Sequence, residues 1–158
     1  MRIFTEHPMD HFPVRPLQFA MDKIGNDQVV WSRTCPEFSV FINALGLHIP
    51  YFERYLIRSL RNAKEQVTDE DLRRDISAII GQEAHHARNF VLFNQVLARK
   101  YPKVVRFDNE AREYFEARSQ RDSLMLQVGF TAGYETFTFL SGMIILQNYD
   151  KWFADSDP

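Results

Sequence analysis

A glutamate and a histidine three residues apart, Glu83 and His86, form the pair of side chains in this sequence best suited to bind a metal ion. Residues at i and i+3 lie on one face of a helix, so both side chains could reach a single cation. The pair interrupts a stripe of apolar residues spaced three and four apart, at positions where the pattern calls for Leu or Ile. The stripe consists of Leu72, Ile76, Ile79, Ile80, Phe90, Val91, Phe93 and Leu97. We therefore predict that Glu83 and His86 face the core of a helical protein as metal ligands.

Two more glutamates interrupt apolar helical stripes. Glu53 lies among Phe52, Leu56, Ile57 and Leu60, and Glu135 is the single acid between residues 124 and 146. An unpaired buried carboxylate is costly and would take up a proton. Three such carboxylates and an imidazole explain one another if a cation lies among them. Glu53, Glu83, His86 and Glu135 are thus the predicted metal ligands. Their oxygen and nitrogen donors suit iron, manganese or zinc better than calcium or magnesium.

Each of these residues also has a purely structural interpretation. A Glu-x-x-His spacing alone is a weak signal in a chain with this many glutamates and five histidines. Glu83 and His86 could form a buried ion pair or hydrogen bond. Glu53 could be an acid placed favourably near a helix start, and Glu135 a protonated core residue bonded to a Thr or Tyr. The joint placement of all four on apolar stripes favours the metal site.

The composition indicates an ordinary single domain. The chain has 158 residues with 45% apolar and 25% charged residues, enough to bury one substantial core. A net charge of −2 gives no electrostatic basis for binding nucleic acid. A single cysteine, Cys35, excludes an internal disulfide and a cysteine-based zinc site. With no apolar signal-peptide core at the N-terminus, the cytoplasm is the expected location.

One apolar segment, residues 124–146, is long enough to span a bilayer. It contains the spacing Gly129-x-x-x-Gly133, which lets membrane helices pack closely. Several Thr, Ser and Gln residues dilute its hydrophobicity, and no basic cluster follows it to set an orientation. We therefore interpret it as a core helix and expect no membrane span.

Helix signals recur along most of the chain, and no segment alternates cleanly enough to predict a strand. Gly46 is placed to end a first helix, and Pro50 to begin a second. Thr68 and Asp71 resemble a capping box at the start of a long third helix. The expected helices cover about 37–44, 50–65, 68–100, 108–119 and 122–149. The expected class is all-α.

Residues 1–36 are expected to form an irregular arm that wraps a helical-bundle domain at 37–158. Pro8, Pro13, Pro16 and Pro36 punctuate this arm, and a strand or turn is expected near Val29–Trp31.

Two segments of the chain are similar to a bacterial family catalogued as predicted metal-dependent hydrolases. They are Glu53-Arg54-Tyr55-Leu56-Ile57-Arg58-Ser59-Leu60-Arg61 and Gly81-Gln82-Glu83-Ala84-His85-His86-Ala87-Arg88. That family resembles the ferritin-like di-iron carboxylate proteins in its ligand order: a Glu, a Glu-x-x-His, a second Glu and a second Glu-x-x-His. The resemblance covers about residues 30–150. It implies that Glu53, Glu83 with His86, and Glu135 are the first three parts of this ligand set.

The chain departs from the family pattern at three points. Phe90 and Thr136 stand where the pattern often has further histidines, and the fourth helix with the second Glu-x-x-His is absent. The resemblance therefore implies a ferritin-like bundle that is incomplete at the C-terminus. Such a truncated bundle would leave an open apolar groove, which a second copy in a homo-oligomer could fill, and the chain could be inactive.

Three functions are consistent with these observations. The preferred one is a di-iron oxidase or oxygenase acting on an apolar small molecule, because bundle-core sites of this ligand type are usually di-iron sites. There Glu83 would bridge the two metals, with Glu53, His86 and Glu135 terminal. The second is a metal-dependent hydrolase that uses a metal-activated water. The third is a non-catalytic helical module that binds another protein.

Overall fold

The structure, a computed structural model, describes residues 14–21 and 29–156. Within these ranges the chain forms helices and no strand, so the all-α class and the helical bundle are confirmed. The helices are α1 (Pro36–Lys64), α2 (Glu70–Lys100), α3 (Val104–Arg121), α4 (Leu124–Gln147) and the short α5 (Tyr149–Trp152). The ferritin-like character of the bundle stays a prediction.

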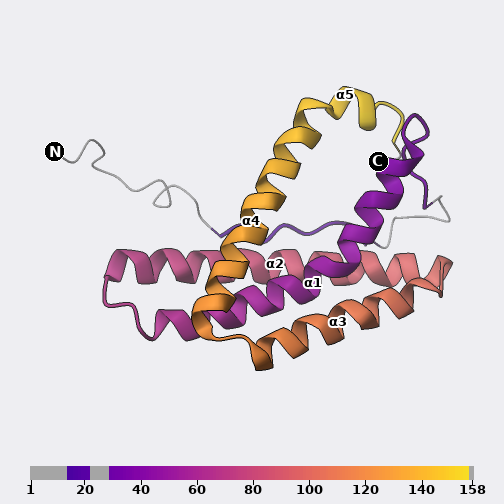
Figure 1. Ribbon diagram of the computed structural model, residues 1–158. Coiled ribbons are helices and arrows are strands. Elements are labelled where there is room, and N and C mark those ends of the chain that lie inside the picture. Colours follow the sequence, from indigo (N-terminus) through magenta and orange to yellow (C-terminus); the bar gives the residue numbers. More distant parts are fainter. Residues whose placement is uncertain (1–13, 22–28, 157–158) are drawn as a thin grey trace.

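Helix α1 is the centre of the bundle, and it packs against α2, α3 and α4 (Figure 1). One cluster of the core lies where α1 meets α3 and consists of Phe52, Tyr55, Leu56 and Phe115. Phe130 and Tyr134 of α4 pack against this core from a third side. The ring of Tyr134 stacks on that of Phe52 with 3.8 Å between centroids. The many aromatic residues thus fill the space that joins three helices.

The expected break between a helix ending near Ala44 and another beginning at Pro50 was wrong, because α1 is continuous through both Gly46 and Pro50. A proline inside a helix removes the hydrogen bond to the carbonyl four residues earlier, here that of Gly46. Asn94 of α2 replaces this bond: its Nδ2 donates to the Gly46 oxygen at 2.8 Å, in a buried position. The helix therefore continues past the proline, and α1 changes direction partway along its length (Figure 1).

Two predicted helix starts also differ from the structure. The N-cap of α2 is Asp69 and not Thr68: its side chain accepts a hydrogen bond from the Leu72 N–H at 2.9 Å. Helix α3 begins at Val104, four residues before Asp108, where the helix was expected to begin. Asp108 instead accepts a hydrogen bond from the Tyr51 hydroxyl at 2.6 Å, and so ties α3 to α1.

Helix α4 agrees closely with its predicted bounds and has the Ser123 side chain as its cap. The face of α4 that lies away from α1 is apolar and exposed. Its large exposed residues are Met125, Leu126, Phe137, Phe139, Leu140, Met143, Ile144 and Leu146. No helix in the described ranges is long and apolar enough to cross a membrane.

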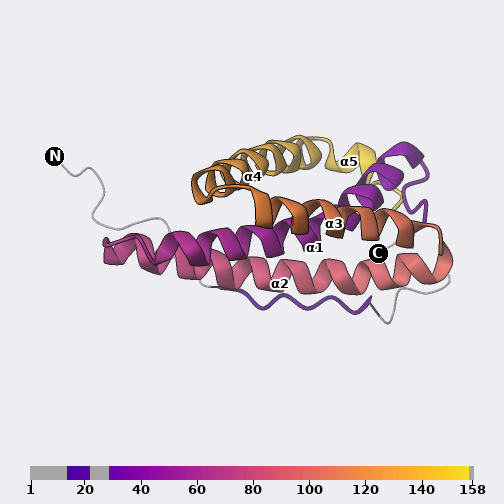
Figure 2. The same ribbon diagram turned by 60° about the horizontal axis from the view of Figure 1, so that its bottom comes forward.

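The N-terminal segments pack on two different parts of the bundle. Residues 14–21 run in extended form along α2 (Figure 2). Residues 29–35 lead into α1, where the Trp31 ring stacks on that of Phe153 with 5.4 Å between centroids. The strand or turn expected near Val29–Trp31 is a bend at Val29, and residues 30 and 31 are irregular.

Candidate metal centre

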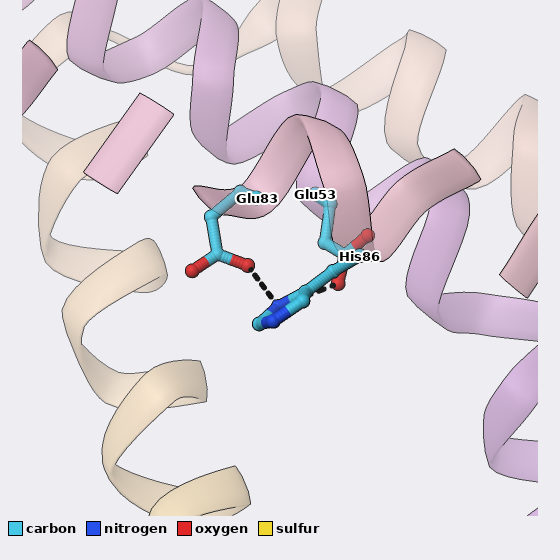
Figure 3. A group of neighbouring side chains, drawn as sticks. All are labelled: Glu53, Glu83 and His86. Atoms are coloured by element: carbon cyan, nitrogen blue, oxygen red, sulfur yellow. Dashed lines mark hydrogen bonds and ion pairs between the residues drawn. The ribbon is translucent and has the colours of Figure 1, made fainter. Parts of the chain in front are cut away.

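The packing of α1 on α2 brings three of the four predicted ligands together. Glu53 projects from α1, and Glu83 and His86 project from the facing turn of α2 (Figure 3). One potential ligand atom from each residue lies within 4.8 Å of the other two. Two helices that are remote in sequence thus direct two carboxylates and one imidazole to the same point.

The imidazole nitrogen Nδ1 of His86 is the atom that faces both carboxylates. It lies 2.8 Å from Oε2 of Glu83 and 3.7 Å from Oε1 of Glu53. The exposed fractions of the side chains are 5% for Glu53, 15% for Glu83 and 42% for His86. The site is therefore buried at Glu53 and open to solvent at His86, so small molecules in solution could reach it.

Glu53 has the surroundings expected of a metal ligand. Its Oε2 is buried and has no hydrogen-bond partner in the part of the chain that the structure describes. Burial, together with the nearby charges of Glu83 and Glu135, raises the pKa of Glu53 to about 9. A bound divalent ion would supply both the missing partner and the positive charge. The residues present therefore fit a metal ion.

His86 is held by its hydrogen bond to Glu83, which raises the pKa of the imidazole above its usual range. Partial burial opposes this effect, whereas the charges of Glu83 and Glu135 add to it. The carboxylates around the ring thus create a negative potential at Nδ1, as a site for a cation requires.

Glu135, the fourth predicted ligand, lies outside this three-residue cluster. It is half-buried on α4, and its Oε2 accepts a hydrogen bond from the Thr138 hydroxyl at 3.3 Å. Its pKa is raised, first by burial and then by the charge of Glu83. Glu135 is therefore close enough to interact electrostatically with the cluster, but it does not complete it.

Gln82, which does not interrupt the apolar stripe of its helix, contacts the outer side of His86. Its amide lies 3.1 Å from Nε2 of His86, on the opposite side of the ring from Glu83. The spacing i, i+4 on one helix was the available signal, since such residues are neighbours on the helix surface.

Comparison with known proteins agrees with these observations. A family model described as "Predicted metal-dependent hydrolase" matches residues 13–158, which include every residue of the site. No curated protein and no solved structure matches the chain. The family match and the cluster of two glutamates and a histidine both indicate a metal-dependent protein. The chain belongs to the family of predicted metal-dependent hydrolases.

Proposed function

We propose that Glu53, Glu83 and His86 bind one divalent metal ion and that the protein is a metal-dependent enzyme. The observation that carries the proposal is the buried, unpartnered Oε2 of Glu53 beside a second carboxylate and an imidazole. Three protein donors leave coordination positions free for water and substrate, as catalytic sites require. Iron, manganese or zinc fits this mixture of oxygen and nitrogen donors.

Hydrolysis is the reaction that this arrangement supports best. A metal ion in such a site lowers the pKa of a coordinated water to about 7. Glu135 is suited to accept the proton, because burial and the charge of Glu83 raise its pKa and it lies outside the three-residue cluster. The half-exposed rim at His86 would admit the substrate.

The helix that carries Glu135 suggests what kind of substrate binds. Its exposed apolar residues include Phe139, which lies one turn after Glu135 and so beside it on the helix surface. An apolar small molecule could bury its surface there with its reactive group towards Glu135. The expected homo-oligomer stays a prediction.

Oxidation at a di-iron site is the second candidate. The electrostatic coupling between Glu135 and Glu83 favours it. Glu53, Glu83, His86 and Glu135 together would hold the two ions, which would supply the oxygen chemistry of bundle-core di-iron proteins.

Metal analysis tests the proposal. Protein purified without chelator, or reconstituted with Fe(II), Mn(II) or Zn(II), is expected to hold about one equivalent. Glu83→Ala should abolish binding, because it removes one donor and the hydrogen bond of His86. Glu113→Ala is the matched control, since that side chain is 70% exposed and lies on α3. Full stoichiometry in Glu83→Ala, or less than a tenth of an equivalent in the wild type, would contradict the metal site.

The number of ions and the use of oxygen separate the two reactions. A second equivalent of iron, with oxygen consumption on adding Fe(II), would favour the di-iron oxidase. One equivalent without oxygen consumption, together with cleavage of apolar ester or amide probes that is lost in Glu135→Gln, would favour the hydrolase.

A further inference from the structure

The N-terminal arm contacts α2 on both sides of His86. The backbone N–H of Arg15 donates to Oε1 of Gln82 at 3.1 Å, one turn before the histidine. The carbonyl of Leu17 accepts from Nδ2 of Asn89 at 2.9 Å, one turn after it. Figure 2 shows this segment following α2. The arm is thus attached at two points that bracket a predicted metal ligand.

Gly81 lets the arm approach this closely. A Cβ atom at this position would lie 3.2 Å from Cγ2 of Val14, which is closer than an ordinary van der Waals contact. The absence of a side chain at Gly81 therefore allows Val14 to lie against α2, and it positions the next residue, Arg15, beside Gln82.

The polarity of these hydrogen bonds locates the proton on His86. A backbone N–H can only donate, so Gln82 must direct its amide oxygen at Arg15 and its NH2 group at His86. Nε2 of His86 therefore accepts, and the ring proton lies on Nδ1, where it is donated to Glu83 at 2.8 Å. One N–H of the arm thus determines which nitrogen of the imidazole carries the proton.

A nitrogen that binds a metal must offer a lone pair, and Nδ1 is the ring nitrogen that faces both carboxylates. With Nδ1 bound, the ring proton lies on Nε2 and needs an acceptor. Gln82 could provide one only by turning its amide, which would direct the NH2 group at the N–H of Arg15. Two donors would then face each other, so one of the two contacts must break.

We propose that Gln82 couples the N-terminal arm to the metal site, so that the Arg15–Gln82 hydrogen bond and metal binding at His86 weaken each other. The proposal rests on the metal site proposed above. Coupling of this kind is reciprocal: a docked arm lowers the affinity of the site for metal, and a bound metal releases the arm at Arg15. The arm therefore acts as a latch that favours the metal-free state.

The test combines Zn(II) affinity, measured by competition with a chelator, and backbone order parameters of the arm, measured by 15N relaxation on the full chain. In the wild type, Zn(II) should lower the order parameter of Arg15 from about 0.85 to below about 0.6. That of Leu17, which keeps its bond to Asn89, should change less.

Two variants remove the conflict in different ways. In Gln82→Glu both carboxylate oxygens can accept, so the N–H of Arg15 and a protonated Nε2 of His86 have an acceptor at the same time. The arm should then stay ordered with Zn(II) bound, and the affinity for Zn(II) should rise about fivefold or more. Arg15→Pro removes the donating N–H and should raise affinity similarly. Ala84→Glu, an exposed position on the same turn, controls for the added charge.

The outcomes distinguish the latch from the metal site itself. If the wild type binds one equivalent of Zn(II) but Arg15 stays ordered, the latch is wrong and the metal site stands. The latch is also overturned if Gln82→Glu and Arg15→Pro both leave the Zn(II) affinity unchanged. It is equally overturned if Ala84→Glu raises the affinity as much as Gln82→Glu does and Arg15 stays ordered in every variant. If the wild type binds no metal, both proposals fail.

Discussion

Helices α1 and α4 are both rich in apolar residues, but they use them in opposite ways. In α1, Phe52 and Leu56 are each 1% exposed, and the acid between them, Glu53, is 4% exposed. In α4, Phe139 and Leu146 are 66% and 67% exposed. The same residue type thus contributes to the core in one helix and to the surface in the other. Apolar composition alone does not locate the core, whereas a buried acid inside an apolar face does indicate a site.

The largest expected contrast is in stability. Phe52→Ala should lower the free energy of unfolding by about 3–5 kcal/mol, because it removes a fully buried ring at the junction of three helices. Phe139→Ala should change it by less than about 0.5 kcal/mol. Urea denaturation followed by circular dichroism measures both. A large loss in Phe139→Ala would mean that the exposed face of α4 is covered in solution.

The buried acid of α1 should make the stability of the metal-free protein depend on pH. Folding raises the pKa of Glu53 to about 9, so the folded state favours the protonated form. Its contribution is fully present below the ordinary carboxyl pKa and is lost as pH rises towards 9, by an amount on the order of a few kcal/mol. Glu53→Gln should remove this dependence, as denaturation between pH 5 and pH 9 would show. The exposed Glu113→Gln should not, and equal slopes in the two variants would contradict the assignment.

The hydrogen bond from Asn94 to the Gly46 carbonyl, which keeps α1 continuous, should have the next largest effect on stability. Asn94→Ala should cost about 1–3 kcal/mol, because it leaves the Gly46 carbonyl buried without a partner. In a Pro50→Ala background the restored backbone N–H can satisfy that carbonyl, so the same substitution should cost clearly less. A double-mutant cycle by denaturation measures the difference. Additive effects would show that Asn94 does not compensate for Pro50.

The smallest contrast is between a glycine of α4 and a glycine of α2. Gly133 of α4 has no atom within 4 Å of where a Cβ would lie, so Gly133→Ala should stabilise the protein by about 0.4–1 kcal/mol. A Cβ atom at Gly81 of α2 would lie 3.2 Å from Cγ2 of Val14, so the gain in Gly81→Ala should be reduced or lost. Thermal denaturation of the two variants side by side tests this. An equal gain in stability in Gly81→Ala would mean that Val14 and the N-terminal arm can move away from α2 at little cost.

That Glu53, Glu83 and His86 lie on inward faces was predictable because it depends on local periodicity. Glu53, Glu83 and His86 occupy positions where a helical stripe calls for apolar residues, and the structure brings them together. Glu135 follows the same pattern on α4, yet it lies outside the cluster. The pattern specifies which face of a helix a residue occupies, but the distance between two helices depends on how they pack.

The errors at helix starts have the same origin. Gly46 and Pro50 are ordinary signals for a helix end and a helix start, and Asn94, which overrides them, lies more than 40 residues away in the sequence. Asp108 is a good capping residue, but it bonds to the Tyr51 hydroxyl on another helix. Local rules cannot anticipate a hydrogen bond whose partner comes from a distant segment.

The sequence by itself determined that the protein is helical and that two glutamates and a histidine lie on inward faces, because helical spacing and residue chemistry are properties of the local chain. Only the tertiary structure decided how deeply each predicted ligand is buried, that Glu135 stays apart from the other three, and that Gln82 connects the N-terminal arm to His86. Burial, pKa and hydrogen-bond polarity depend on neighbours from other segments, and those neighbours are determined by packing.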